Sequence, residues 1–373
     1  MSANRWRYAM DAAGAGARTK TAMSGSDARN AGGSAYTQAR TPSASNERGL
    51  FQRKLARYLV VVAILLVYPW LASNFFTFQI GAQSLVLGVI ALSLTFLAGY
   101  GGIVSLSQMT LAGIAGYAVA IFGHSAVSQI SLEWPWWLAS FMAVLLSVAA
   151  ATLIGLISVR TDGIYTIMIT LAIGVAMFYL TQQNYTIFNG FQGFSSLFPP
   201  EILGIGLKDP VPFYYLSLCV ALAAYAAVKY LVRTPFGMAL QGTRDNARRM
   251  RALGFNVAAH RIAAHAFAGL LAGIGGVLLV WYNGRISPGT IGTTALINIL
   301  IIAVIGGLRH PLGAFIGALV FVLLQNFAID LIDRERFNLV IGGAFLLILI
   351  FSPDGLLGLW RRVRGLFHPA RKE

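Results

Sequence analysis

From Tyr58 onward, long apolar stretches alternate with short polar connections, and this pattern restricts the fold more than any other feature of the chain. A bilayer core about 30 Å thick is crossed by roughly 20 residues of α-helix. Ten stretches reach or approach that length, at about 58–76, 80–98, 103–123, 136–158, 164–181, 211–232, 261–282, 292–308, 311–330 and 338–352. Only Arg309, His310 and Pro311 separate the eighth stretch from the ninth, so nine spans is an alternative. The sequence predicts an all-α, polytopic transmembrane helical bundle.

The composition supports a membrane protein and argues against a soluble enzyme. Hydrophobic residues make up 57% of the 373 residues and charged residues 11%, whereas soluble domains carry about 25% charged residues. The single cysteine, Cys219, excludes an internal disulfide framework and a multi-cysteine zinc site. The five histidines are dispersed and have no neighbouring ligand partners, so we expect no metal site.

The net charge of +15 is distributed in a way that indicates the topology. If the N-terminus is cytoplasmic and ten spans alternate, the cytoplasmic segments and adjoining helix ends hold 24 of the 28 Lys and Arg residues. Cytoplasmic loops of membrane proteins are enriched in these residues. Both termini are therefore predicted to be cytoplasmic. The basic charge then needs no nucleic-acid partner, because it faces a membrane surface of lipid.

The same reading divides the chain into three parts. Residues 1–57 contain ten Lys and Arg residues and no apolar run long enough to bury, which predicts a disordered, basic cytoplasmic tail. An organellar transit peptide is the alternative for this segment, because it is also basic and poor in acidic residues. Residues 58–353 form the membrane domain, and residues 354–373 form a second basic cytoplasmic tail.

Two connections are longer than the rest. The loop 233–260 is predicted to lie inside and to contain a short helix, capped by Asp245 and ended by Gly254, with Met250 and Leu253 on one face. Such a helix suits docking into a partner, although a plain basic surface loop would give the same pattern. The loop 182–210, predicted to lie outside, contains the run Asn189-Gly190-Phe191-Gln192-Gly193.

Within the spans, the third is unusually polar. We expect Ser105, Ser107, Gln108 and Thr110 to face the interior of the bundle, because exposing their polar groups to lipid costs free energy. They could line a translocation path or serve close helix packing. Packing is the expected role of the small-residue pairs Gly269/Gly273 and Gly313/Gly317, and we expect His265 to be packed and hydrogen-bonded.

Other functional classes leave no trace in the sequence. The chain has no Gly-x-x-x-x-Gly-Lys-[Ser/Thr] phosphate loop, so it is not expected to bind ATP in that way or to be an enzyme, and no catalytic residue is assigned. The spans contain almost no carboxylates, which weakens an ion-coupled secondary carrier or channel as the alternative class.

An ordered set of motifs over about residues 80–350 resembles the LivM-like permease subunits of bacterial branched-chain amino acid ABC importers. These motifs are Gly99-Tyr-Gly-Gly-Ile-Val-Ser-Leu-Ser-Gln108, Gly113, Gly116-Tyr117, Gly163-Ile-Tyr165, Gly190 and Gly193, Arg233, Pro235-Phe236-Gly237, Ala239-Leu240, Arg244-Asp245-Asn246, Ala252-Leu253-Gly254-Phe255-Asn256, Ile286-Ser-Pro288, Gly306-Gly307, Pro311, Gly313 and Gly317. The chain departs from the family where an acidic residue and small alanines usually precede the Leu-Gly of the loop. Those positions are Ala247, Arg249 and Met250 here.

The resemblance implies partners and roles. The partners would be a second permease subunit, two cytoplasmic ATPase subunits that bind ATP and Mg, and an extracytoplasmic solute-binding protein, at the bacterial inner (plasma) membrane. This chain would need no cofactor of its own. The ATPase-coupling residues would be Arg244, Asp245, Asn246, Met250, Leu253 and Gly254. The contacts to the binding protein would be Asn189, Gly190, Gln192 and Gly193. The cargo would be branched-chain amino acids, with urea, short amides, aromatic compounds or sugars as alternatives.

Overall fold

The computed structural model describes residues 62–127, 129–202, 204–331, 342–343, 346, 355–356 and 358. The predicted tail 1–57 lies outside the described residues, as do most of the last apolar stretch, 338–352, and most of the C-terminal tail. Residues 1–64 and 65–373 form two separate units, and every labelled element lies in the second.

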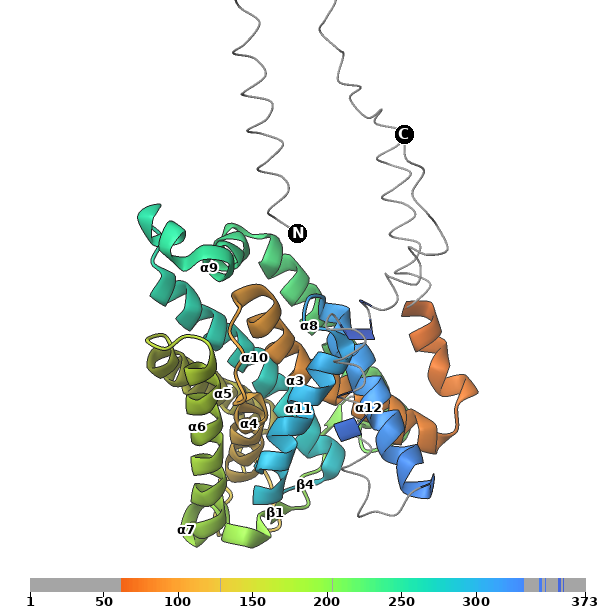
Figure 1. The fold of residues 1–373 in the computed structure, drawn as a ribbon. Coiled ribbons are helices and arrows are strands. Elements are labelled where there is room, and N and C mark those ends of the chain that lie inside the picture. The colour runs from red at the N-terminus through yellow and green to blue at the C-terminus, as the bar shows by residue number, and fades with distance from the viewer. Residues whose placement is uncertain are drawn as a thin grey trace, which may run out of the picture. The chain divides into compact units, whose positions relative to one another are not determined.

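The described part of the second unit is almost entirely helical (Figure 1). Its longer helices are α3 (Gln83–Phe96), α4 (Gln108–Phe122), α5 (Trp136–Ser158), α6 (Ile164–Gln183), α8 (Pro210–Arg233), α9 (Pro235–Ala252), α10 (Val257–Asn283), α11 (Thr293–Gly306) and α12 (Pro311–Leu331). The short elements are η2 (Phe76–Ala82), η3 (Leu97–Gly101), α7 (Tyr185–Phe188), η4 (Gly190–Gln192), η5 (Pro288–Ile291) and the two-residue strands β1 (Phe194–Ser195), β2 (Glu201–Ile202), β3 (Ile205–Gly206) and β4 (Arg285–Ile286). Strand β1 pairs antiparallel with β4, and β2 with β3. The predicted all-α membrane bundle is confirmed in its class.

Five of these helices are long and apolar enough to cross a membrane: Phe76–Gly101, Trp136–Ser158, Ile164–Gln183, Pro210–Arg233 and Val257–Asn283. A sixth span would come from α11 and α12 together, which are bent by 116° at the break between them. The break falls at the predicted boundary of the eighth and ninth stretches, where Gly307 has a φ of 104° that few other residues adopt. The count of about ten spans stays a prediction.

The start of the third predicted span is wrong. The stretch 103–123 is helical only from Gln108, and residues 103–107 form a non-helical connection with a turn at 106–107. Gly102 has a left-handed conformation, with a φ of 68°, that ends the π-helical turn η3. The backbone N–H of Leu106 then donates to Thr170 Oγ1 on α6, at 3.0 Å. A side-chain partner on another helix thus replaces the hydrogen bond that a continuous helix would supply.

Helices α3 and α10 occupy the centre of the core, and glycines let their neighbours approach. Gly276 of α10 lies against the backbone of Ala112 on α4, and Gly275 lies against Ile90 of α3. A side chain at either glycine would overlap its neighbour. Gly269 and Gly273 likewise face α5, where Ser147 Oγ donates to the carbonyl of Gly269 at 3.0 Å. The packing role predicted for this glycine pair is confirmed.

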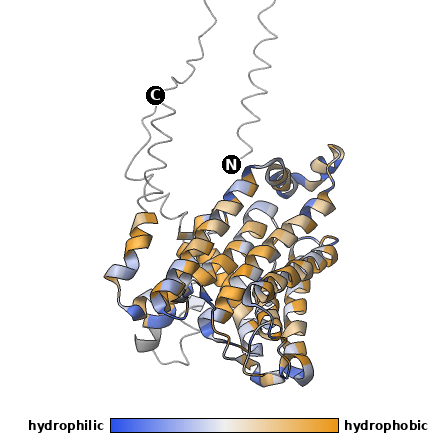
Figure 2. Ribbon diagram, turned by 180° about the vertical axis from the view of Figure 1, so that it is seen from behind, coloured by the Kyte–Doolittle hydropathy of each residue, from blue (hydrophilic) through white to orange (hydrophobic). Residues whose placement is uncertain are grey.

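The exposed faces of α5 and α6 are apolar, as expected of helices in contact with lipid. Large hydrophobic side chains of α5 and α6 are exposed, among them Phe141, Leu153 and Met168 at 60–63%. Hydrophobic residues dominate the helices of the bundle, while hydrophilic ones gather in the connections and along α9 (Figure 2). A soluble protein would seldom expose so much apolar surface.

Candidate functional site

The predicted coupling loop contains a longer helix than expected. Thr234 ends α8, and its hydroxyl accepts from the backbone N–H of Gly237 at 3.4 Å, so that it caps α9. Pro235 occupies the first helical position, where its missing N–H costs nothing. Gly237 lies against the backbone at Leu231, a contact that a larger residue would block. The helix α9 therefore begins directly where the membrane helix stops, and α9 turns away from it (Figure 1).

The predicted cap at Asp245 is wrong, and the neighbouring residue takes that role. Asn246 has non-helical angles, φ −158° and ψ 93°, which interrupt α9. Its side-chain Oδ1 accepts from the backbone N–H of Arg249 at 3.0 Å, the geometry of a helix N-cap. At the other end, Gly254 has a φ of 86°, and the N–H of Phe255 donates to the carbonyl of Met250. The predicted end of the helix at Gly254 is confirmed.

Arg244 ties α9 to the membrane helices. Its Nη1 donates to the carbonyl of Gly99 in η3 at 2.5 Å, and its Nε and Nη2 donate to Asp245 Oδ1 at 3.0 and 2.9 Å. The aliphatic part of Arg244 lies directly over Gly102. Gly99 in turn rests on the backbone of Leu308, in the break between α11 and α12. One side chain of α9 thus contacts the point where two interrupted membrane helices meet.

The rest of α9 presents a mixed surface. Leu240 is fully buried in the main hydrophobic core, so this end of the helix is fixed. Met250, predicted to lie on the docking face, instead packs back against Gly242 and is half-buried. Leu253 is 66% exposed and is followed by the exposed Phe255. Beyond the interruption at Asn246, the exposed apolar edge consists of Leu253 and Phe255, beside the exposed side chains of Arg248, Arg249 and Arg251.

The four polar residues of the third stretch all lie inside the bundle. Ser105, Ser107, Gln108 and Thr110 are 0–2% exposed. Gln108 Oε1 accepts from Ser93 Oγ of α3 at 2.8 Å, and the hydroxyls of Ser105 and Ser107 are 2.9 Å apart. Only Gln108 and Thr110 belong to α4 itself. In this conformation Gln108 links α4 to α3 through Ser93, and the role in a translocation path stays a prediction.

A row of buried, hydrogen-bonded threonines on α6 was not predicted from the sequence. Thr166 and Thr170, with Gly174, form a buried stripe at a spacing of four residues. Thr170 Oγ1 donates to the carbonyl of Thr166 at 2.9 Å, and Thr166 Oγ1 donates to the carbonyl of Thr161 at 3.0 Å. Together with the Leu106–Thr170 bond, these contacts lead from the interior polar group to the end of α6. The i, i+4 spacing of hydroxyls on an apolar helix was the signal for it.

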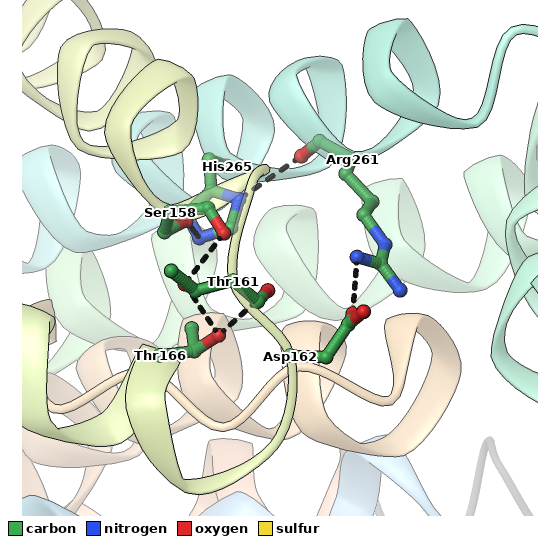
Figure 3. A network of polar contacts seen from close by, with 6 residues as sticks. All are labelled: Ser158, Thr161, Asp162, Thr166, Arg261 and His265. Carbon is green, nitrogen blue, oxygen red and sulfur yellow. Dashed lines mark hydrogen bonds and ion pairs between the residues drawn. The ribbon is translucent and has the colours of Figure 1, made fainter.

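The series of threonine hydrogen bonds leads to a pocket of about 320 Å³. The pocket lies between the segment 102–104, the turn joining α5 to α6, and the first turns of α10. Arg261 Nη1 pairs with Asp162 Oδ1 at 2.6 Å, across 99 residues of sequence (Figure 3). His265 is packed and hydrogen-bonded as predicted, since its Nδ1 donates to the carbonyl of Arg261 at 2.9 Å and Ser158 Oγ lies 3.4 Å from its Nε2. Asp162 lies in the connection between α5 and α6 and Arg261 near the start of α10, so no local sequence pattern pairs them.

The loop 182–210, predicted to lie outside, is built by the residues predicted to contact a binding protein. Asn189 Nδ2 donates to the carbonyl of Gly193 at 2.6 Å, and both Gly190 and Gly193 are buried with positive φ values. Gly193 lies against the carbonyl of Ile286, beside the pairing of β1 with β4. Of the predicted contact residues only Gln192 is exposed, next to Phe191 at 69% exposed.

The sequence of this chain is similar to those of known permease proteins. The family described as "Branched-chain amino acid transport system / permease component" matches residues 76–350. The chain is 26% identical to the high-affinity branched-chain amino acid transport system permease protein LivM of Escherichia coli K12, over 82% of this chain and 75% of that protein. It is also 25% identical to the ribose import permease protein RbsC of Haemophilus influenzae, over 83% of this chain and 95% of that protein.

A further relative is the nucleoside ABC transporter permease protein NupC of Lactococcus lactis, 26% identical over 61% of this chain and 74% of that protein. No solved structure matches the chain. The family match runs from the first π-helical turn through α12, and so includes α9, the buried polar residues and the loop 182–210. The chain belongs to the branched-chain amino acid transport system permease family of ABC transporters.

Proposed function

We propose that this chain is the membrane subunit of an ATP-driven importer of branched-chain amino acids. It would pair with a second permease subunit, two cytoplasmic ATPases and an extracytoplasmic solute-binding protein in the bacterial inner membrane. About ten spans would cross that membrane, with both termini in the cytoplasm. The relatives named as permease proteins of branched-chain amino acid transport systems support this cargo. Catalysis would belong to the partner ATPases, which bind ATP and Mg.

The contact of Arg244 with the Gly99 carbonyl carries the coupling part of the proposal. A partner that binds the exposed edge at Leu253 and Phe255 would rotate α9 about its buried part, because Leu240 is fixed in the core. Movement of Arg244 would then act on η3 and, through Gly99, on the break between α11 and α12. Both sites interrupt regular helices, so they can rearrange without breaking a long hydrogen-bonded segment.

In this mechanism ATP binding shifts the bundle between two states. The ATPases would bind the two states with different affinity, and that difference is the most they can contribute to the shift. Ser105, Ser107, Gln108 and Thr110, which are buried in this conformation, would line the path in the other state. The loop 182–210 would meet the binding protein through Phe191 and Gln192, which are the exposed residues of the run 189–193.

Affinity purification in mild detergent tests the assembly. The tagged chain should recover two ATPases and a second permease. Replacement of residues 244–254 by a Gly/Ser linker should remove the ATPases while the second permease stays bound. A matched control replaces residues 201–206, which include β2 and β3, with the same kind of linker. ATPases that remain bound to the 244–254 variant would contradict the assignment of α9 as the coupling helix.

A sugar or nucleoside permease is the second candidate, because the ribose and nucleoside relatives match comparable stretches of the chain. Both candidates share the assembly and the coupling helix and differ only in cargo. Competition of labelled leucine uptake by unlabelled ribose, nucleoside or isoleucine separates them. Inhibition by isoleucine alone is the result expected here.

A further inference from the structure

The pocket between α5, α6 and α10 combines two kinds of wall. Aliphatic side chains of Ile103, Val104, Val159, Ile164 and Ile167 line most of it. The ion pair of Arg261 with Asp162 lines the remainder, together with buried hydroxyls. A volume of about 320 Å³ is at the lower end of the range for ligand sites, so the occupant would be a small molecule.

The two charged residues are unequally placed. The side chain of Arg261 is 17% exposed, whereas that of Asp162 is 78% exposed. The Nε–H of Arg261 is buried and has no hydrogen-bond partner among the described residues. A guanidinium has five N–H donors, and this ion pair uses one of them. Arg261 therefore retains donors for a second carboxylate, while Asp162 remains open to a cation.

We propose that this pocket binds an aliphatic α-amino acid on the side of the membrane that carries α9. Arg261 pairs with the carboxylate of the ligand and Asp162 with its ammonium group, while the branched side chain packs against Ile103, Val104 and Ile167. The proposal rests on the proposed function and adds to it a binding site within the permease itself. A zwitterion fits between two opposite charges, whereas a sugar would meet an ion pair and aliphatic walls with few groups to match its hydroxyls.

The position of the pocket gives its occupant a route to the coupling helix. Gly102 lines the pocket and also lies under the side chain of Arg244. The threonine chain from Thr161 through Thr166 to Thr170 leads from the same pocket to the N–H of Leu106. A bound amino acid would therefore contact the segment 102–104, and Arg244 also contacts its first residue, Gly102. It would be the last site that the cargo occupies before release, or the site from which accumulated product slows the transporter.

The test measures binding to the full chain with its partner permease in lipid nanodiscs, without the binding protein. The probes are labelled L-leucine and 4-methylpentanoate, which is leucine without its ammonium group. Arg261→Gln should weaken both probes by at least about tenfold, because each loses a charge-assisted pair. Asp162→Asn should weaken leucine by a similar factor but leave 4-methylpentanoate bound as well or better, because a competing carboxylate is gone. Arg285→Gln, at the exposed β4, is the matched control and should change neither.

Two results would overturn the site. One is that neither probe binds the unaltered protein at millimolar concentration. The other is that leucine binds both pocket variants as it binds the unaltered protein. Arg261→Lys, which keeps the charge but loses the planar fork, replaces Arg261→Gln if that variant does not fold, and it should weaken both probes to a smaller extent. ATP-driven uptake of leucine by the complete transporter separates the two proposals. Leucine uptake with unchanged binding in both variants rejects only the pocket, and the absence of leucine uptake rejects the cargo.

Discussion

Substitution of Arg244 tests the mechanical link between α9 and the membrane helices. Arg244→Gln keeps a polar side chain but removes the charged donor to Gly99 and the two donors to Asp245. A hydrogen bond from a charged group contributes about 1.5–3 kcal/mol. The pair with Asp245 is exposed and contributes about 0.2–1 kcal/mol. Most of the loss therefore comes from the contact with the Gly99 carbonyl.

The energy of the hydrogen bond between Arg244 and the Gly99 carbonyl sets the expected effect on transport. If the contact transmits the movement of α9, its loss lowers the coupling free energy by about 1.5–3 kcal/mol, which corresponds to roughly a 10- to 150-fold change in an equilibrium. The assay uses proteoliposomes with the complete transporter, and it measures leucine uptake and ATP hydrolysis in the same sample. Arg244→Gln should keep its ATPases and lower the uptake per ATP hydrolysed by about tenfold or more.

Asp245→Asn is the matched control for this experiment. It removes only the exposed ion pair, so the uptake per ATP should fall by no more than about fivefold. Transport by Arg244→Gln that is as efficient as in the unaltered protein, or a larger effect of Asp245→Asn, would contradict a mechanical role of the Gly99 contact. Loss of the ATPases from the Arg244→Gln sample would instead place Arg244 in the partner interface.

Three further predictions concern local structure. Asn246→Ala removes the cap of the second part of α9 and should destabilise that segment by about 1 kcal/mol, seen as faster amide hydrogen exchange confined to it. Gly193 has a positive φ of 66°, and an added Cβ would overlap the carbonyl of Ile286, so Gly193→Ala should lower the free energy of unfolding by more than about 1 kcal/mol in a thermal unfolding assay. The control Gly206→Ala, whose Cβ would enter open space, should be near neutral in the same assay. Gln108→Leu removes the acceptor 2.8 Å from Ser93 in α3, and should cost about 1 kcal/mol in that assay because the Ser93 hydroxyl keeps a backbone acceptor.

The sequence predicted the helices where hydropathy alone decides. The stretches 136–158 and 164–181 correspond to α5 and α6 within two residues at each end, because lipid demands a continuous apolar helix. The prediction was wrong where tertiary contacts replace helical hydrogen bonds. Residues 103–107 precede an apolar helix without a Gly or Pro break, but the N–H of Leu106 finds its partner in Thr170 of another helix.

The candidate site was predicted in part for the same reason. Capping by a short polar side chain was expected at Asp245, yet the geometry selects Asn246, and residue preference barely separates the two. The burial of the polar group around Gln108 followed from the cost of exposing it to lipid. The pairing of Arg261 with Asp162 depends on how α5, α6 and α10 pack, which no local pattern encodes.

The central claim is that this permease moves its cargo only when ATPases act on α9. Its most direct test is uptake of labelled leucine into proteoliposomes that contain the complete transporter, with binding protein on one side and ATP on the other. We expect uptake that requires ATP and is abolished when residues 244–254 are replaced by a Gly/Ser linker. Uptake by the purified chain alone, without ATP or ATPases, would contradict the account and identify a secondary carrier.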